Sequence, residues 1–151
     1  MNKLTALIMT AGLTAMATAC VDRGAYSSFT TVEPQGWAYG DTLRFEVARA
    51  DSLKPGTLTV AVRNTNLYPY SNLWLEVSYN HDGRPYRDTV NMRLADAYGR
   101  WTGKGFGAEY QTEATVAQGV VPANGSTITL RHIMRADTLR GLEHVGVTLK
   151  P

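Results

Sequence analysis

The sequence predicts an all-β protein: an antiparallel β-sandwich of about seven to eight strands that follows an N-terminal signal peptide and a short tether. Apolar and polar residues alternate with a period of two over most of the chain after residue 36, and almost no segment has a helical period. Turn residues such as Lys54-Pro55-Gly56 separate the alternating runs. Strands with one polar face each need a second sheet over their apolar faces, so a sandwich is favoured and a small β-barrel is the alternative.

Residues 1–19 are typical of a bacterial lipoprotein signal peptide. Lys3 supplies a charged start, Leu4 to Leu13 form a short apolar run, and small residues lead to Cys20, the one cysteine of the chain. The apolar run is shorter than the stretch of about 20 residues that spans a bilayer. We therefore expect Cys20 to carry lipid and to anchor the chain to a membrane; the alternative is a free buried cysteine after an ordinary secretory signal.

The remaining chain is long enough for one domain with a full hydrophobic core. We expect residues 20–35 to be the lipidated cysteine and its tether, and residues 36–151 to be a single sandwich domain. The irregular segment Leu94 to Gly107 is expected to be a long ordered loop. The expected strands are residues 43–48, 58–63, 73–79, 86–94, 114–121, 126–134 and 144–149.

The alternation assigns side chains to faces. It directs Leu73, Leu75 and Val77 inward and places Trp74 on the polar face, where it either contacts a partner or is covered by a loop. Asp88 falls on an apolar face, which predicts a buried hydrogen bond to a neighbouring turn or to an arginine. His132 is expected to be a core histidine. The arginines expected on polar faces are Arg44, Arg63, Arg87, Arg93 and Arg131.

The residues that could support catalysis are not arranged for it. The segment Gly99 to Gly105 resembles a phosphate-binding loop, but its glycine spacing is wrong and no helix follows. Tight turns explain these glycines better, with Trp101 and Phe106 closing the end of the sandwich. The three histidines have no recognised metal-ligand spacing, and no serine lies in a nucleophile setting. We therefore expect no enzyme activity, no metal and no cofactor.

Several short motifs together resemble one known family. They are Gly36-Trp37, Asn72-Leu73-Trp74-Leu75, Leu94-Ala95-Asp96, Gly99-Arg100-Trp101, Gly103 to Gly107 and Met134-Arg135. In this order, behind a lipoprotein signal, they are similar to the GldH family of gliding-motility-associated lipoproteins of the Bacteroidota. The resemblance implies an envelope lipoprotein linked to gliding and its secretion machinery, without catalytic residues. It points to Cys20 as the anchor. Residues 21–24 lack the acidic run that directs many such lipoproteins to the cell surface, so an outer-membrane anchor facing the periplasm is expected.

The leading hypothesis is an interaction module that binds other envelope proteins of the gliding or secretion apparatus. Its candidate surface consists of Trp74, Asp96, Arg100, Trp101, Lys104 and Phe106. The alternative is a glycan-binding lipoprotein that stacks sugars on Trp74, Tyr79 or Tyr98, and an unrecognised hydrolase is a third possibility. With 15 Lys+Arg against 13 Asp+Glu and no long charged runs, a nucleic-acid partner is not expected.

Overall fold

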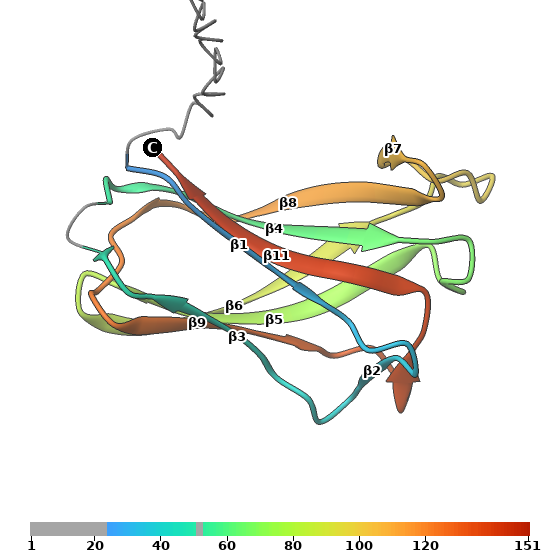
Figure 1. Ribbon diagram of the computed structural model, residues 1–151, viewed down its shortest axis with the longest axis horizontal. Coiled ribbons are helices and arrows are strands. Elements are labelled where there is room, and N and C mark those ends of the chain that lie inside the picture. The colour runs from blue at the N-terminus through green and yellow to red at the C-terminus, as the bar shows by residue number, and fades with distance from the viewer. Residues whose placement is uncertain (1–23, 51–52) are drawn as a thin grey trace, which may run out of the picture.

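The computed structural model describes residues 24–50 and 53–151, and within them the chain forms two facing antiparallel sheets and a small third one (Figure 1). One sheet has the strand order β1-β11-β4-β8-β7, the facing sheet has the order β3-β9-β5-β6, and β10 pairs with β2. The strands are β1 (Tyr26–Thr31), β2 (Trp37–Ala38), β3 (Leu43–Val47), β4 (Gly56–Asn64), β5 (Asn72–His81), β6 (Arg84–Arg93), β7 (Lys104–Phe106), β8 (Glu109–Val120), β9 (Ser126–His132), β10 (Thr138–Leu139) and β11 (Leu142–Lys150).

The predicted sandwich is confirmed. The described strands form separate sheets and do not close into the small barrel that was the alternative. All seven predicted strands are present, as β3, β4, β5, β6, β8, β9 and β11. The described part of the chain contains no helix with the length and hydropathy needed to cross a membrane. The predicted signal peptide and Cys20 lie outside the described residues.

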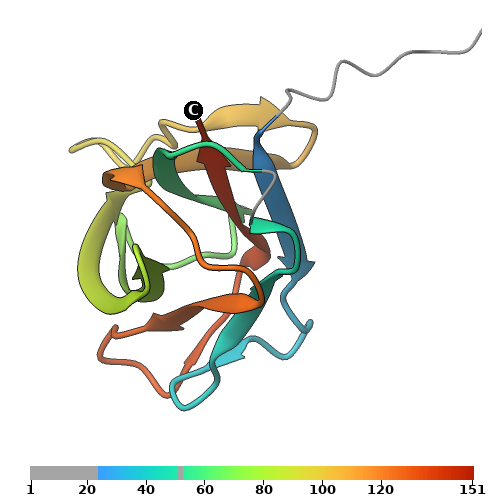
Figure 2. The same ribbon diagram turned by 90° about the vertical axis from the view of Figure 1, so that its left-hand side faces the viewer.

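The core lies between the central strands of the two sheets. Leu58, Val60 and Val62 of β4 and the inward residues of β5 are fully buried, as the alternation predicts. Leu73, Leu75 and Val77 have no exposed surface at all, and each such side chain contributes about 1.5–3 kcal/mol through burial. Figure 2 views the molecule along the strands, with the two sheets on opposite sides of this core.

The structure corrects two predicted boundaries. Residues 26–31, expected in the tether, form β1, which pairs along its whole length with β11. As an edge strand it has side chains that are at most half-buried, so its sequence lacks the strong alternation of a core strand. The predicted loop 94–107 contains the short strand β7. β8 begins at Glu109 and not at residue 114, because the polar segment 109–113 also pairs within the sheet.

The sandwich has two different ends. Gly24 and Pro151 lie at the end that also holds the turns 82–83 and 121–125, which we call the terminal end (Figure 1). The opposite end, called the loop end, is built from the segments 32–42, 65–71, 94–103 and 133–141. Backbone hydrogen bonds tie these four segments to one another: Tyr39 N donates to Asp137 O, Thr65 N to Gly141 O, and Leu94 N to Ser71 O. The loop end is therefore a connected surface.

Gly141 shows how closely the loop end is packed. Its φ of +84° is a conformation that side chains rarely adopt, and an added Cβ would meet the backbone nitrogen of Tyr68. We predict that Gly141→Ala lowers the free energy of unfolding by about 2–4 kcal/mol, through backbone strain and overpacking together. Denaturant unfolding of the full chain measures this loss.

Gly105→Ala is the matched control, because Gly105 has no positive φ and nothing lies within 4 Å of its would-be Cβ. Its effect should stay within about 0.5 kcal/mol. Equal losses in the two variants would contradict the described packing of Gly141 against the 65–68 turn.

Candidate functional site

The 94–103 loop is organised by the carboxylate of Asp96. Its Oδ1 accepts hydrogen bonds from the backbone N–H groups of Tyr98 (2.9 Å) and Arg100 (3.0 Å), and its Oδ2 pairs with Arg100 Nε at 3.0 Å. The Arg100 amide contributes most to lowering the pKa of Asp96, with further contributions from the Tyr98 amide and the Arg100 guanidinium. Gly99, at φ +77°, allows the chain to turn between them. Asp96 and Arg100 therefore hold the loop in one shape.

Trp101 links this loop to the 65–71 segment and to β8. Its indole Nε1 donates to Asn66 Oδ1 at 2.7 Å, and its ring lies 6.2 Å from that of Tyr110. It is half-buried and packs against the hydrophobic core, so the prediction that Trp101 closes this end of the sandwich is confirmed. Phe106 ends β7, and its side chain lies outside the described part of the structure.

Lys104 starts β7 and lines a separate groove between β7 and β8. This groove has a volume of about 320 Å³ and is otherwise lined by Thr102, Gly103, Gln111, Thr112 and Glu113. The segment 99–105 passes from a turn into an edge strand, without the helix that a phosphate-binding loop needs at its end. Lys104 and Asp96 therefore line different hollows.

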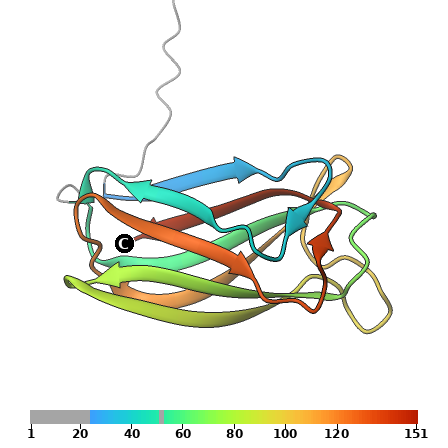
Figure 3. The same cartoon turned by 90° about the horizontal axis from the view of Figure 1, so that it is seen from below.

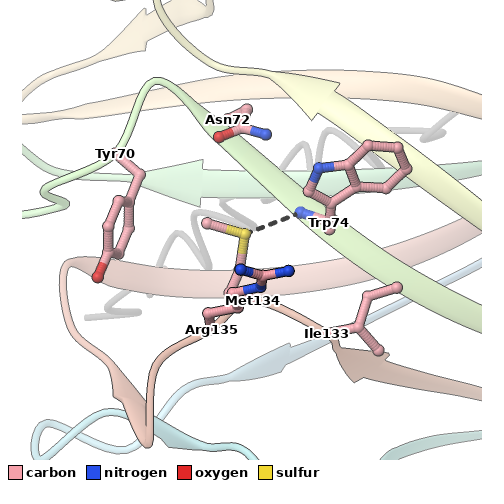
Figure 4. A pocket seen from close by; sticks show the side chains of 6 residues that line it. All are labelled: Tyr70, Asn72, Trp74, Ile133, Met134 and Arg135. Carbon is pink, nitrogen blue, oxygen red and sulfur yellow. Dashed lines mark hydrogen bonds between the residues drawn. The ribbon is translucent and has the colours of Figure 1, made fainter.

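Trp74 lies in a cleft at the loop end of β5 (Figure 4). Its side chain is 41% exposed, so the alternative that a loop covers it is wrong. Met134 lies between the rings of Tyr70 and Trp74, and the Met134 sulfur accepts a hydrogen bond from the Trp74 backbone N–H at 3.3 Å. The cleft has a volume of about 470 Å³, and its remaining lining residues are Asn72, Ile133 and Arg135.

Asn72 connects this cleft to the 94–103 loop. It also lines a second hollow of about 360 Å³ together with Asn91, Asp96 and their neighbours. The Asn72 side chain donates to Asn91 Oδ1 at 2.9 Å, which bridges β5 and β6 between the two hollows. The structure therefore brings Trp74 and Asp96 to one continuous surface, although they are far apart in sequence. Tyr70 and Met134 belong to the same surface and were not predicted as site residues. Met134 was noted only as part of the Met134-Arg135 motif, and no pattern distinguishes Tyr70 from other loop residues.

His132 and Asp88, the two titratable residues that the sequence places toward the core, each have a hydrogen-bond partner. No cluster of three or more His, Cys, Asp or Glu residues in the described part of the chain could hold a metal ion. His132 is fully buried, as predicted; its Nε2 is 3.1 Å from the Trp37 carbonyl, and burial lowers its pKa. Asp88 is half-buried and accepts a hydrogen bond from the Tyr79 hydroxyl at 2.6 Å, so its partner is a tyrosine of the paired strand and not the expected turn or arginine. Burial, and then this carboxylate, raise the pKa of Tyr79 to about 12.

Comparison with known proteins gives a family match over most of the chain. Residues 24–149 match the family described as GldH lipoprotein. A curated relative, the gliding motility lipoprotein GldH homolog of Christiangramia forsetii, is 31% identical over 90 residues. That alignment covers 58% of this chain and 54% of the relative, so the match spans about half the length of the curated relative.

Solved structures are similar only at a coarse level. An exo-β-1,3-galactanase from Phanerochaete chrysosporium is 14% identical, with a TM-score of 0.37 over 83% of this chain and 26% of the enzyme. The globular domain of zebrafish complement 1qA protein is 11% identical, with a TM-score of 0.37 over 85% of this chain and 96% of that domain. Likenesses of this size carry no argument about function.

We predict that Asp96→Ala loosens the 94–103 loop without unfolding the sandwich. The substitution removes the acceptor for two backbone N–H groups and the partner of Arg100 on an exposed loop. Hydrogen exchange should therefore quicken at the amides of Tyr98 and Arg100, while exchange in β4 and β5 stays unchanged. Asp96→Asn keeps an acceptor oxygen and should show a smaller change. Unaltered loop exchange in Asp96→Ala would contradict the organising role of this carboxylate.

Proposed function

The chain belongs to the GldH lipoprotein family and is related to a gliding motility lipoprotein, and from this premise we propose that it is a non-catalytic interaction module of the cell envelope. In this proposal Cys20 carries a lipid anchor that is inserted in the outer membrane, and the sandwich faces the periplasm. The loop end binds another protein of the gliding or secretion apparatus.

The observation that carries the proposal is the distribution of exposed hydrophobic side chains. Of the eight large hydrophobic residues that are exposed among those described, four lie in the segments of the loop end: Tyr39, Leu67, Tyr70 and Tyr98. A fifth, Trp74 on β5, lines a cleft together with Tyr70. Exposed aromatic residues grouped on one surface are typical of protein interfaces, where tyrosine and tryptophan contribute most of the binding energy. The two most exposed, Tyr98 at 85% and Leu67 at 78%, project from neighbouring loops of this end.

The position of the chain termini supports the same proposal. Gly24, the first described residue, lies at the terminal end, where the backbone of Lys54 contacts it. An anchor on Cys20 would hold that end close to the membrane, because only a few residues separate Cys20 from Gly24. The loop end would then face away from the membrane, toward other proteins.

The test is crosslinking of the native full-length lipoprotein in intact cells. We predict that Trp74→Ala and Tyr98→Ala reduce recovery of the partner about tenfold, because each removes an exposed aromatic contact without a core contribution. Trp101→Ala is less suitable, since this side chain supports the loop itself.

Tyr86→Ala is the matched control. Tyr86 is 44% exposed, similar to Trp74, but it stacks on Tyr79 near the β5–β6 turn at the terminal end. All three variants must be present at equal abundance. If Tyr86→Ala reduces crosslinking as much as Trp74→Ala, or if neither loop-end variant has an effect, the loop end is not the binding surface.

A second candidate function, glycan binding, is favoured by the Trp74 cleft alone. The cleft combines an exposed indole and the Tyr70 ring with the Asn72 amide and Arg135, which is a suitable set for stacking on and hydrogen-bonding a sugar. Tyr79 is only 7% exposed and cannot serve as a platform, so this candidate retains Trp74 and Tyr98. A glycan-array signal that Trp74→Ala abolishes would favour it; an array without signal would leave the protein-binding proposal.

A further inference from the structure

The outer face of the four-stranded sheet carries a polar groove that the proposed function does not use. Figure 3 looks onto this sheet, with β3, β9, β5 and β6 side by side. The groove has a volume of about 580 Å³ and crosses all four strands. It is lined by Gly40, Thr42, Arg44, Glu76, Ser78, Arg87, Thr129 and Arg131.

The strand register arranges these residues in rows. Arg44 is paired with Thr129, Thr129 with Ser78, and Ser78 with Arg87. One straight row across the sheet therefore has an arginine at each end and two hydroxyl groups between them. With about 4.8 Å between neighbouring strands, the backbones of Arg44 and Arg87 are about 14 Å apart. In the next row Arg131 is paired with Glu76.

The groove has more positive than negative charge. Its lining contains three arginines and one carboxylate, that of Glu76. Glu76 Oε1 is 3.3 Å from Arg131 and 3.9 Å from Arg87, so it orients two guanidinium groups but can neutralise only one. Among the described residues, Arg44 has no ion-pair partner. Glu46 is on the same face of β3 but does not line the groove.

The arginines are available to a ligand. The side chain of Arg87 is 70% exposed and that of Arg131 is 38% exposed. The contact between Arg87 and Glu76 is long, at 3.9 Å, and ion pairs with an exposed partner are weak, so Arg87 can exchange it for a ligand carboxylate at little cost. Guanidinium groups bind carboxylates with two parallel hydrogen bonds, and the Ser78 and Thr129 hydroxyls can bind polar groups between them.

We propose that this groove binds an extended acidic segment of the partner protein, with carboxylates at the two ends of the Arg44–Thr129–Ser78–Arg87 row. This inference rests on the proposed function, whose partner it describes chemically. An extended chain advances about 3.4 Å per residue, so acidic residues about four positions apart match the distance between the arginines.

Two observations favour a protein segment over a glycan or a membrane. The lining of the groove contains no aromatic side chain on which a sugar ring could stack. The groove also adjoins the proposed interface, because Trp74, Glu76 and Ser78 are successive outward residues of β5. A partner seated at the Trp74 cleft can continue along the same face into the groove.

The test uses the full-length protein in a non-ionic detergent and two labelled Ser/Thr-rich peptides. One peptide carries two glutamates about four positions apart, and in the other both are replaced by glutamine. We predict that the glutamate peptide binds about tenfold more tightly and that this preference weakens with salt. The Arg44→Gln/Arg87→Gln variant should lose the preference. Arg84→Gln/Arg140→Gln, with the same change in net charge outside the groove, should keep it.

Arg44→Gln alone breaks no ion pair and should weaken the preference even if the double variant folds poorly. Equal binding of the two peptides, or an equal loss in the control variant, would overturn the proposal. The proposal would also be overturned if phosphatidylglycerol vesicles or polygalacturonate bind through the groove arginines and the glutamate peptide does not bind. These failures are distinct from failure of the proposed function, because crosslinking through Trp74 and Tyr98 does not depend on the groove.

Discussion

The burial of alternate side chains of β4 and β5 between the two sheets is the interaction on which the rest of the structure depends. The chain has a single cysteine, so no disulfide within it can support the fold, and packing has to supply the stability. Because inward residues such as Val60 and Leu75 are fully buried, the residues between them are fixed on the outer faces. The positions of Trp74, Glu76 and Ser78 in one outward line on β5 are a direct consequence.

A sandwich of this kind leaves two places for binding, its ends and its outer faces. The terminal end holds the connections from β3 to β4, from β5 to β6 and from β8 to β9, whereas the loop end contains four segments that backbone hydrogen bonds tie to one another. Asp96 shapes one of these segments, and Trp101 ties it to the 65–71 segment. The exposed aromatic residues therefore stand on a connected base, which limits the conformational entropy that they lose when a partner binds.

Much of this arrangement could be predicted from the sequence, and the exceptions have physical causes. The alternation Leu73, Leu75, Val77 predicts both the core strand and the position of Trp74 on its outer face, because side chains of a strand point alternately to its two faces. Whether a loop covers Trp74 there could not be predicted. β1 was assigned to the tether because an edge strand buries too little to need strong alternation. The Trp74 cleft could not be predicted, since Tyr70 and Met134 reach it through loops whose path depends on tertiary contacts. The register that aligns Arg44 with Arg87 likewise follows from pairing across four strands.

The central claim is that the anchored end and the binding end are opposite ends of the sandwich, separated by strands of ten residues that span about 33 Å. The most direct measurement is fluorescence quenching by lipid-headgroup quenchers in vesicles that contain the full-length lipoprotein. One fluorophore is attached through Arg84→Cys near the β5–β6 turn, and another through Ala97→Cys in the 94–103 loop. The account predicts strong quenching at position 84 and weak quenching at position 97. Equal quenching, or stronger quenching at position 97, would contradict it.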